Sequence, residues 1–308
     1  MSFIAANEAV PLRRQLWADG LLAVVTLIWG STFVLVKDVV EQVPVLPFLA
    51  TRFAIGAGVL FVAVLLLNRW RGLTMRELLW GTITGVALGV GYALQTLGLQ
   101  DESTSASKAG FITGLSVVIV PVLSFLVLRQ RLGKWTVAGV VLATAGLALL
   151  SLRLDEGTRV TGGDLLVLGC AVAFAIHILL VAHASGWANP LRITAVQVTV
   201  AGLLCALGAA GMGHRLPNMS EGVLASAAFL GVAATAVAFL VQVSVQRFTT
   251  AAHTALIFTL EPVFAAIFGI WLHNDVLGIN GWVGAGLILT SMLVTELLPY
   301  MVRRNAAT

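Results

Sequence analysis

The sequence predicts an all-α polytopic membrane protein, and three observations support this fold class. Hydrophobic residues make up 59% of the 308 positions and charged residues only 10%, against roughly 45–50% and about 25% in soluble domains. The mean hydropathy is +0.99. The apolar residues form long continuous runs, such as 117–128, and not the short alternating segments of a membrane β-barrel. A soluble globule is therefore excluded.

Ten apolar runs are long enough for a transmembrane helix, which takes about 20 residues. Charges, prolines and polar clusters separate the runs. The first run follows Arg13 and Arg14, as in a signal peptide, but it is too long for one, so we expect it to stay as a helix. The expected helices are 18–38, 46–68, 76–99, 107–128, 134–152, 163–184, 191–212, 222–246, 251–272 and 278–301.

Lysines and arginines favour alternate loops, as expected for loops that face the cytoplasm. If the N-terminus is inside, twelve of the 18 lie on the cytoplasmic side. This distribution predicts that both termini are cytoplasmic. The six on the other side are Lys37, Arg52, Lys108, Arg153, Arg159 and Arg215.

An internal repeat appears when the sequence is laid on itself at an offset of 145 residues. Between Thr104 and Leu142 the overlay has no gap, and nine of 39 positions are identical, beginning with Thr104 on Thr249. Asp19 likewise falls on Asp164. Each copy holds five helices, an odd number, so the second copy must enter the membrane from the opposite side. We therefore expect two inverted five-helix repeats, residues 1–155 and 156–308, that together form one transport domain, as in secondary transporters.

Several function classes find no support in the sequence. The net charge is +4, but the sequence contains no basic patch with interleaved aromatic residues, so no nucleic-acid partner is expected. Cys170 and Cys205 lie in apolar runs without metal-ligand spacing, and no cofactor or metal is expected. The zinc, nucleotide-loop and nucleophile-elbow motifs of enzymes are absent, so we expect no enzyme. No obligate protein partner is evident; the expected partners are the lipid bilayer and a small-molecule substrate.

Four short motifs resemble a known family. They are Trp29-Gly30-Ser31-Thr32-Phe33, Arg52-Phe53, Thr104-Ser105-Ala106-Ser107-Lys108-Ala109-Gly110-Phe111 and Leu260-Glu261-Pro262-Val263. As a set they resemble the EamA family of the drug/metabolite transporter superfamily, over nearly the whole chain. The resemblance implies two five-helix repeats and export of small metabolites.

Polar and aromatic residues inside the helices predict a substrate cavity. Phe239, Gln242 and Gln246 form a stripe on one helical face, and Tyr92 and Gln95 occupy the corresponding part of the other repeat. A pocket with flat apolar walls and a few amides suits an amphipathic zwitterion such as an amino acid. Any single aromatic residue here also fits a role in helix packing. The expected substrate-binding residues are Trp29, Ser31, Phe33, Tyr92, Gln95, Phe174, His177, Phe239, Gln242 and Gln246.

Three ionisable residues have two interpretations each. Glu261, beside Pro262, fits a proton or substrate-ammonium site, or a structural hydrogen bond between helices. His177 fits a cavity position or a buried neutral histidine bonded to a neighbouring helix. Lys108 fits a snorkelling side chain or a charge at the gate of the cavity.

Together these observations predict a secondary transporter in a bacterial cytoplasmic (inner) membrane. We expect it to export aromatic and other neutral amino acids, and related small metabolites, by alternating access. The alternatives are a multidrug or nucleotide-sugar carrier of the same superfamily, or a channel.

Overall fold

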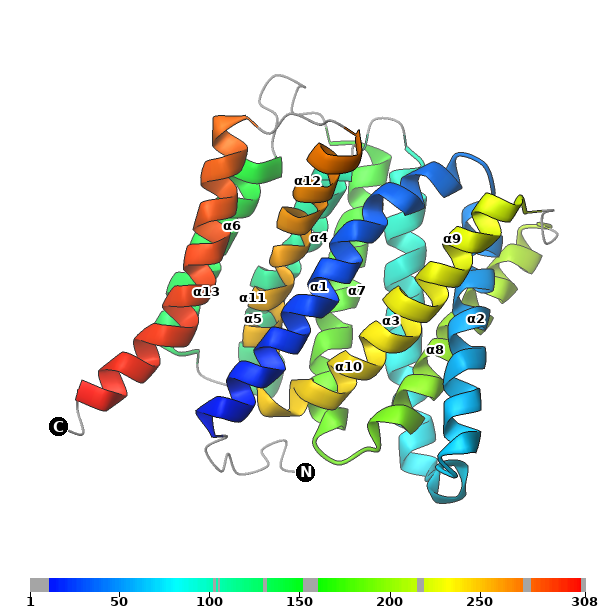
Figure 1. The fold of residues 1–308 in the computed structure, drawn as a ribbon, viewed down its shortest axis with the longest axis horizontal. Helices are drawn as coiled ribbons and strands as arrows, with labels where there is room; N and C mark the ends of the chain where they lie inside the picture. Colours follow the sequence, from blue (N-terminus) through cyan, green and yellow to red (C-terminus); the bar gives the residue numbers. More distant parts are fainter. Residues whose placement is uncertain are drawn as a thin grey trace.

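The computed structural model describes residues 11–101, 104, 106–129, 132–151, 160–214, 219–273 and 278–305. Every regular element in this part of the chain is a helix (Figure 1). The elements are α1 (Leu12–Val40), α2 (Val45–Leu66), η1 (Trp70–Gly72), α3 (Met75–Leu99), α4 (Ala106–Gly114), α5 (Ser116–Leu128), α6 (Lys134–Ser151), α7 (Gly162–Ser185), α8 (Pro190–Gly211), α9 (Glu221–Gly231), η2 (Val232–Val237), α10 (Ala238–Val245), η3 (Gln246–Phe248), α11 (Ala251–Phe258), α12 (Leu260–His273) and α13 (Ile279–Asn305).

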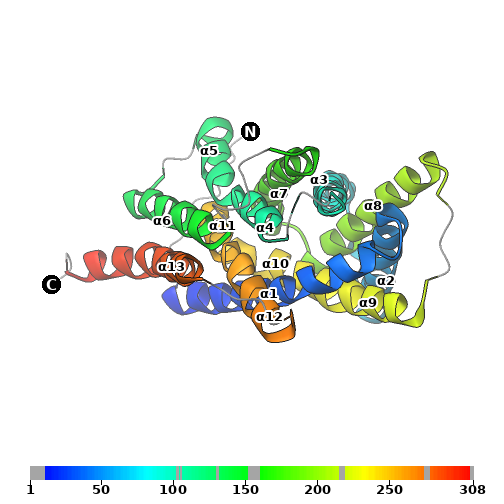
Figure 2. The same cartoon turned by 90° about the horizontal axis from the view of Figure 1, so that it is seen from above.

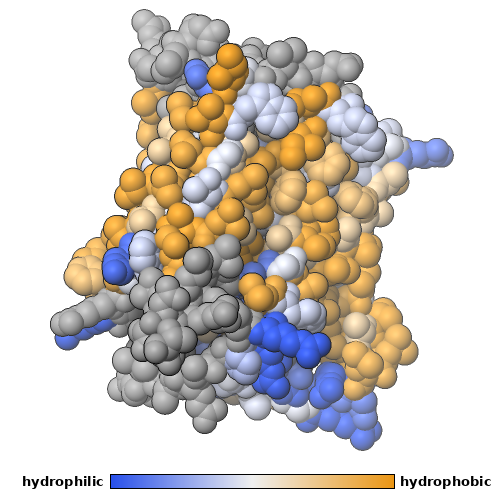
Figure 3. Space-filling model, turned by 60° about the vertical axis from the view of Figure 1, so that its left-hand side comes forward, coloured by the Kyte–Doolittle hydropathy of each residue, from blue (hydrophilic) through white to orange (hydrophobic). Residues whose placement is uncertain are grey.

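Eight helical stretches are long and apolar enough to cross a membrane, and two shorter apolar helices, 134–149 and 279–295, accompany them. Their outward faces carry large apolar side chains, for example Phe61, Leu207 and Trp271, which are 60%, 69% and 75% exposed. On the face drawn in Figure 3, hydrophobic residues cover most of the height and hydrophilic residues gather at the lower edge. The chain is thus a multi-pass helical membrane protein; the count of ten spans stays a prediction.

The helix ends follow from local chemistry. Thr74 and Thr161 each begin a helix with a capping box, in which the hydroxyl accepts from the backbone N–H three residues on and the acid there bonds back. Pro190 occupies the first turn of α8, where its missing N–H is not needed. These signals explain why the expected helix boundaries lie close to the observed ones.

Two of the expected helices are interrupted in the middle. Leu115 separates α4 from α5, and Thr259 separates α11 from α12. The expected helix 222–246 contains a π-helical turn, Val232–Val237, between α9 and α10. Single helices were expected at all three places, with a bend allowed only beside Pro262. Backbone irregularity at membrane depth is tolerated only inside protein or beside a cavity, so these breaks mark the interior.

The helices form two groups when the molecule is seen from above (Figure 2). On one side α2, α3, α8 and α9 lie together, and on the other α6 packs along α13. Helices α1 and α7 lie between the groups, with the interrupted helices α4–α5 and α11–α12 beside them. Figure 1 shows that α1 begins and α13 ends on the same side of the molecule.

Small residues let the central helices approach closely. A side chain at Gly30 would collide with the backbone of Glu261 and with Phe264, so α1 and α12 touch through backbone there. A side chain at Gly85 would collide with the backbone of Gln197, which brings α3 against α8. The first of these contacts fixes Glu261 beside Trp29.

Candidate functional site

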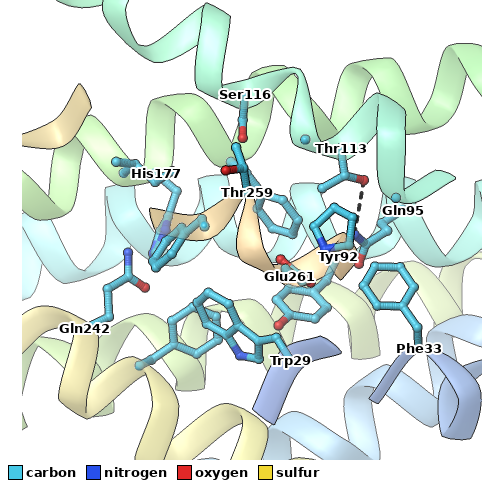
Figure 4. A pocket seen from close by; sticks show the side chains of 17 residues that line it. Trp29, Phe33, Tyr92, Gln95, Thr113, Ser116, His177, Gln242, Thr259 and Glu261 are labelled. Atoms are coloured by element: carbon cyan, nitrogen blue, oxygen red, sulfur yellow. Dashed lines mark hydrogen bonds between the residues drawn. The ribbon is translucent and has the colours of Figure 1, made fainter. Parts of the chain in front are cut away.

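A cavity lies at the centre of the helices, next to the breaks at Leu115 and Thr259 (Figure 4). It encloses about 660 Å³ of space between atoms, part of it continuous with the outside. Its lining comes from α1, α3, α4, α5, α7, α10, α11 and α12. The lining residues are Trp29, Phe33, Tyr92, Gln95, Gly110, Thr113, Gly114, Ser116, Phe174, His177, Ile178, Phe239, Gln242, Phe258, Thr259, Glu261 and Pro262.

Aromatic rings form much of the cavity wall. The Trp29 ring centroid lies 5.3 Å from that of Phe239 and 5.1 Å from that of Phe258. Tyr92 meets Phe174 edge to face at 5.4 Å. The Trp29 indole N–H donates to the carbonyl of Ala234 in the π-helical turn, at 2.9 Å. The rings therefore have fixed positions and present flat apolar surfaces to a ligand.

The polar side chains of the wall belong to short hydrogen-bond chains. Gln95 Nε2 donates to Thr113 Oγ1 at 3.3 Å. Gln242 Nε2 donates to Gln246 Oε1 at 3.1 Å. His177 Nε2 lies 3.1 Å from Gln197 Oε1 on the neighbouring helix α8. The interhelix bond expected for a structural histidine is thus present, and His177 also lines the cavity.

Glu261 is the acidic residue of the wall. It lies in the first turn of α12, where the positive end of the helix dipole stabilises a carboxylate. Within the described part of the chain its carboxylate has no hydrogen-bond or ion-pair partner. The break at Thr259 exposes this turn to the cavity, so Glu261 does not lie within an unbroken helix as the sequence indicated.

Arg52 supplies an opposite charge from behind the wall. It is 2% exposed, and its guanidinium lies 4.7 Å from the centroid of the Tyr92 ring. It donates to Tyr92 Oη at 3.3 Å and to Thr235 Oγ1 at 3.0 Å. Its charge acts on Glu261 from beyond ion-pair distance. Arg52 is therefore an interior residue of α2, and counting it among the loop cations was wrong; Arg153, Arg159 and Arg215 lie outside the described residues.

The structure brings together nine of the twelve residues singled out from the sequence: Trp29, Phe33, Tyr92, Gln95, Phe174, His177, Phe239, Gln242 and Glu261. Ser31 does not line the cavity, and its hydroxyl donates to the carbonyl of Ile28. Gln246 lies behind Gln242, in η3, and donates to the carbonyl of Ile178. Lys108 belongs to α4, but its side chain is outside the described part of the structure.

Eight lining residues escaped the sequence analysis: Gly110, Thr113, Gly114, Ser116, Ile178, Phe258, Thr259 and Pro262. The repeat itself contained the missing signal. At the offset of 145, Ser116 falls on Glu261 and Gly114 on Thr259, while Trp29 falls on Phe174. Tyr92 and Gln95 fall on Phe239 and Gln242 at an offset of 147. Extending the expected site residues to their repeat mates finds two of the eight, Ser116 from Glu261 and Ile178 from Phe33.

The residues described contain no group of three or more His, Cys, Asp or Glu side chains that could hold a metal ion. Both cysteines are free thiols, buried in α7 and α8.

Comparison with known proteins identifies the family. The model of the EamA-like transporter family matches the chain twice, over residues 16–152 and 161–297. The chain belongs to the EamA-like transporter family. The two matched ranges are again 145 residues apart.

Relatives of similar length are described as transporters. An uncharacterized transporter of Archaeoglobus fulgidus is 33% identical over 297 residues, which cover 96% of this chain and 91% of the relative. The uncharacterized inner membrane transporter YedA of Escherichia coli K12 is 24% identical over 298 residues, 94% of each chain. A solved crystal structure with 18% identity and a TM-score of 0.75 covers 92% of this chain and 98% of its own, and shares the fold. The family supports a transporter role, with small molecules as substrates, rather than an enzymatic one.

Proposed function

We propose that the protein is a secondary transporter that exports aromatic and other neutral amino acids, and related small metabolites, by alternating access across the bacterial cytoplasmic membrane. Residues 1–155 and 156–308 form two inverted five-helix repeats with ten spans, and both termini are cytoplasmic. In this topology the end where α1 begins faces the cytoplasm and the end where α7 begins faces outward.

One observation carries the proposal: a cavity with aromatic walls and few polar groups lies inside an apolar helix bundle, and its lining residues are mates in the repeat. Two similar halves that face opposite ways provide two states of similar energy around one central site. Flat rings match an aromatic or aliphatic side chain, and amides, hydroxyls and Glu261 match an amino-acid head group. The sequence motifs also resemble those of the amino acid exporter YddG.

The alternatives fit the cavity less well. A nucleotide-sugar carrier needs cations for its phosphates, and no described side chain of the lining is a lysine or arginine. A multidrug carrier would share the aromatic walls but would have no need of the amide groups of Gln95 and Gln242. A channel has no need of two similar halves.

Counterflow in proteoliposomes tests the function. Liposomes that contain the purified protein and an excess of unlabelled amino acid should accumulate the same labelled amino acid, with saturable initial rates. Competition by quaternary cations or sugars alone would contradict the amino-acid assignment, and flux that rises linearly with concentration would indicate a channel.

Gln242→Ala sharpens this test. We expect it to weaken transport about tenfold to a hundredfold, because the substrate head group loses a buried partner. Cys205→Ala is the matched control, since it removes only a small apolar group of α8 away from the cavity. Equal initial rates for the two variants at equal expression would show that α10 does not line the substrate path.

A further inference from the structure

The hydrogen bonds behind the cavity fix the orientation of the Gln242 amide. The carbonyl of Ile178 is only an acceptor, so the Gln246 group that lies 2.8 Å from it must be the Nε2 donor. Gln246 Oε1 is therefore the atom that accepts a hydrogen bond from Gln242, and the donor on Gln242 must be Nε2. This leaves Gln242 Oε1, a fully buried oxygen with no hydrogen-bond partner among the described residues, on a side chain that lines the cavity.

Glu261 provides further unused acceptors in the same cavity. Neither carboxylate oxygen bonds another described residue, and Arg52 lies behind the ring of Tyr92 and does not line the cavity. In Figure 4 Glu261 and Gln242 flank Trp29 and face the same space. Gln242 and Glu261 thus present unused acceptors on this side of the cavity, one an amide oxygen and the other a carboxylate.

Two donors of the cavity, in contrast, are already in use. Thr259 Oγ1 donates to the carbonyl of Leu256 at 2.6 Å, and Gln95 Nε2 donates to Thr113. The unused acceptors of Gln242 and Glu261 favour a ligand with N–H donors, and a carboxylate beside the ligand disfavours an anion. An unpaired carboxylate at membrane depth also costs free energy, which a cation would recover.

The rings around Glu261 suit a cation as well. Trp29 and Tyr92 line the cavity on the same side as the carboxylate, and the ring of Phe258 lies 5.1 Å from that of Trp29. The faces of aromatic rings attract ammonium groups. The two halves of the cavity differ here, because the repeat mate of Glu261 is the neutral Ser116. A bound ligand would therefore take one orientation, with its positive end at α12.

We infer that this side of the cavity is a subsite for a positively charged amine, with Glu261 as counter-ion, Gln242 Oε1 as second acceptor and aromatic rings as walls. The inference rests on the proposed transport function and narrows its substrate class. The amine is the required group of the substrate and the carboxylate is dispensable, so arylalkylamines are ligands alongside amino acids.

Three ligands that share one phenyl ring separate the two head groups: phenylalanine, 2-phenylethylamine and 3-phenylpropionate. Their binding to the purified full-length protein is measured in detergent by tryptophan fluorescence, which avoids passive passage of the amine through a bilayer. We expect phenylethylamine to bind within about tenfold of phenylalanine, and phenylpropionate about a hundredfold more weakly. Phenylpropionate binding as tightly as the amine would overturn the subsite, as would failure of the amine to bind.

Variants of Glu261 test whether this residue is the counter-ion of the bound amine. Glu261→Gln should weaken amine binding about tenfold to a hundredfold, whereas Glu261→Asp, which keeps the charge, should retain most of it. Glu221→Gln is the matched control, because Glu221 is exposed at the start of α9. A melting curve of each variant shows whether it is folded; a folded Glu261→Gln with native amine affinity would overturn the proposal. Counterflow with amino acids decides the transport function separately, since a transporter without the amine subsite would still accumulate label.

Discussion

The two ends of the helix bundle contain matching residues in different arrangements. At the α7 end, Thr104 Oγ1 donates to Asp164 Oδ1 at 3.0 Å and lies 2.9 Å from Thr161 Oγ1. At the α1 end, the repeat mates of Thr104 and Asp164 are Thr249 and Asp19. There Asp19 pairs with His253 at 3.3 Å, and the buried hydroxyl of Thr249 bonds none of the described residues.

The backbones also approach differently at the two ends. A Cβ atom at Gly163 would lie 2.6 Å from that of Asp101 and 2.7 Å from the carbonyl oxygen of Gly98, so α7 is pressed against the end of α3. Asp101 accepts a hydrogen bond from the N–H of Gly163 at 2.9 Å. The repeat mate of Gly163 is Ala18, whose buried methyl group fills the space that is absent at Gly163. Repeat-related residues therefore take different arrangements at the two ends, and the α7 end has the closer backbone contact. The alternating access proposed above requires such a difference between the ends.

Among the variants considered, a larger side chain at Gly163 in the α7 end should have the largest effect on stability. Gly163→Val places two methyl groups where the backbones of α3 and α7 touch, and we expect it to destabilise the protein by about 3 kcal/mol and to lower the melting temperature by several degrees. Gly162→Val is the matched control, because a Cβ atom there meets nothing within 4 Å.

Gly163→Val also tests whether the contact between α3 and α7 closes the cavity at the α7 end. A thiol reagent that cannot cross membranes should modify a cysteine at Thr113 faster from the α7 side in Gly163→Val than in the Gly163 parent, both in a Cys170→Ala, Cys205→Ala background. Equal labelling rates would show that this contact does not close the cavity.

The helical fold and most of the residue types of the cavity could be predicted from the sequence, but the positions of the helix interruptions could not. Apolar run length and the capping residues Thr74 and Thr161 are local signals, so the helix boundaries were predicted closely. The interruption at Thr259 has one local signal, Pro262, which frees a backbone carbonyl and allows a bend. Leucine occurs in continuous helices, so the interruption at Leu115 has none, and no local signal gives the exact residues of the two breaks. They depend on packing of the half-helices around the cavity, which only the structure shows.

Arg52 illustrates the same limit. A lone arginine near the start of an apolar run is typical of a helix end, although Arg52 lies within the expected helix 46–68. Its interior position depends on Thr235 and Tyr92, which are 183 and 40 residues away along the chain. The stacked guanidinium is satisfied only once α2, α3 and the π-helical turn have come together.

A smaller difference in stability is expected between alanine variants of Asp164 and Asp19. Asp164→Ala removes the return bond of the α7 capping box, from the Thr161 N–H, and the bond from Thr104, and we expect a loss of about 2–3 kcal/mol in the free energy of unfolding. Asp19→Ala removes the contact with His253 and should cost about 1 kcal/mol. Melting temperatures of the two variants, measured side by side, check the order; an equal or larger loss at Asp19 would mean that the α1 end is the more firmly held.

The smallest difference is expected for the two threonines, and it is the most direct comparison because valine has nearly the same shape. Thr104→Val removes the donor to Asp164 Oδ1 and keeps the bond from the Thr161 N–H to Oδ2, so we expect a loss of about 1–2 kcal/mol. Thr249→Val replaces a buried hydroxyl that bonds none of the described residues, and should change stability by less than about 0.5 kcal/mol or raise it slightly. If a substrate or inhibitor traps the protein with the α1 end sealed, the order of the two melting temperatures should reverse, because Thr249 then takes the position of Thr104. An order that never reverses, with any ligand that binds, would show that the two ends differ permanently and do not exchange roles.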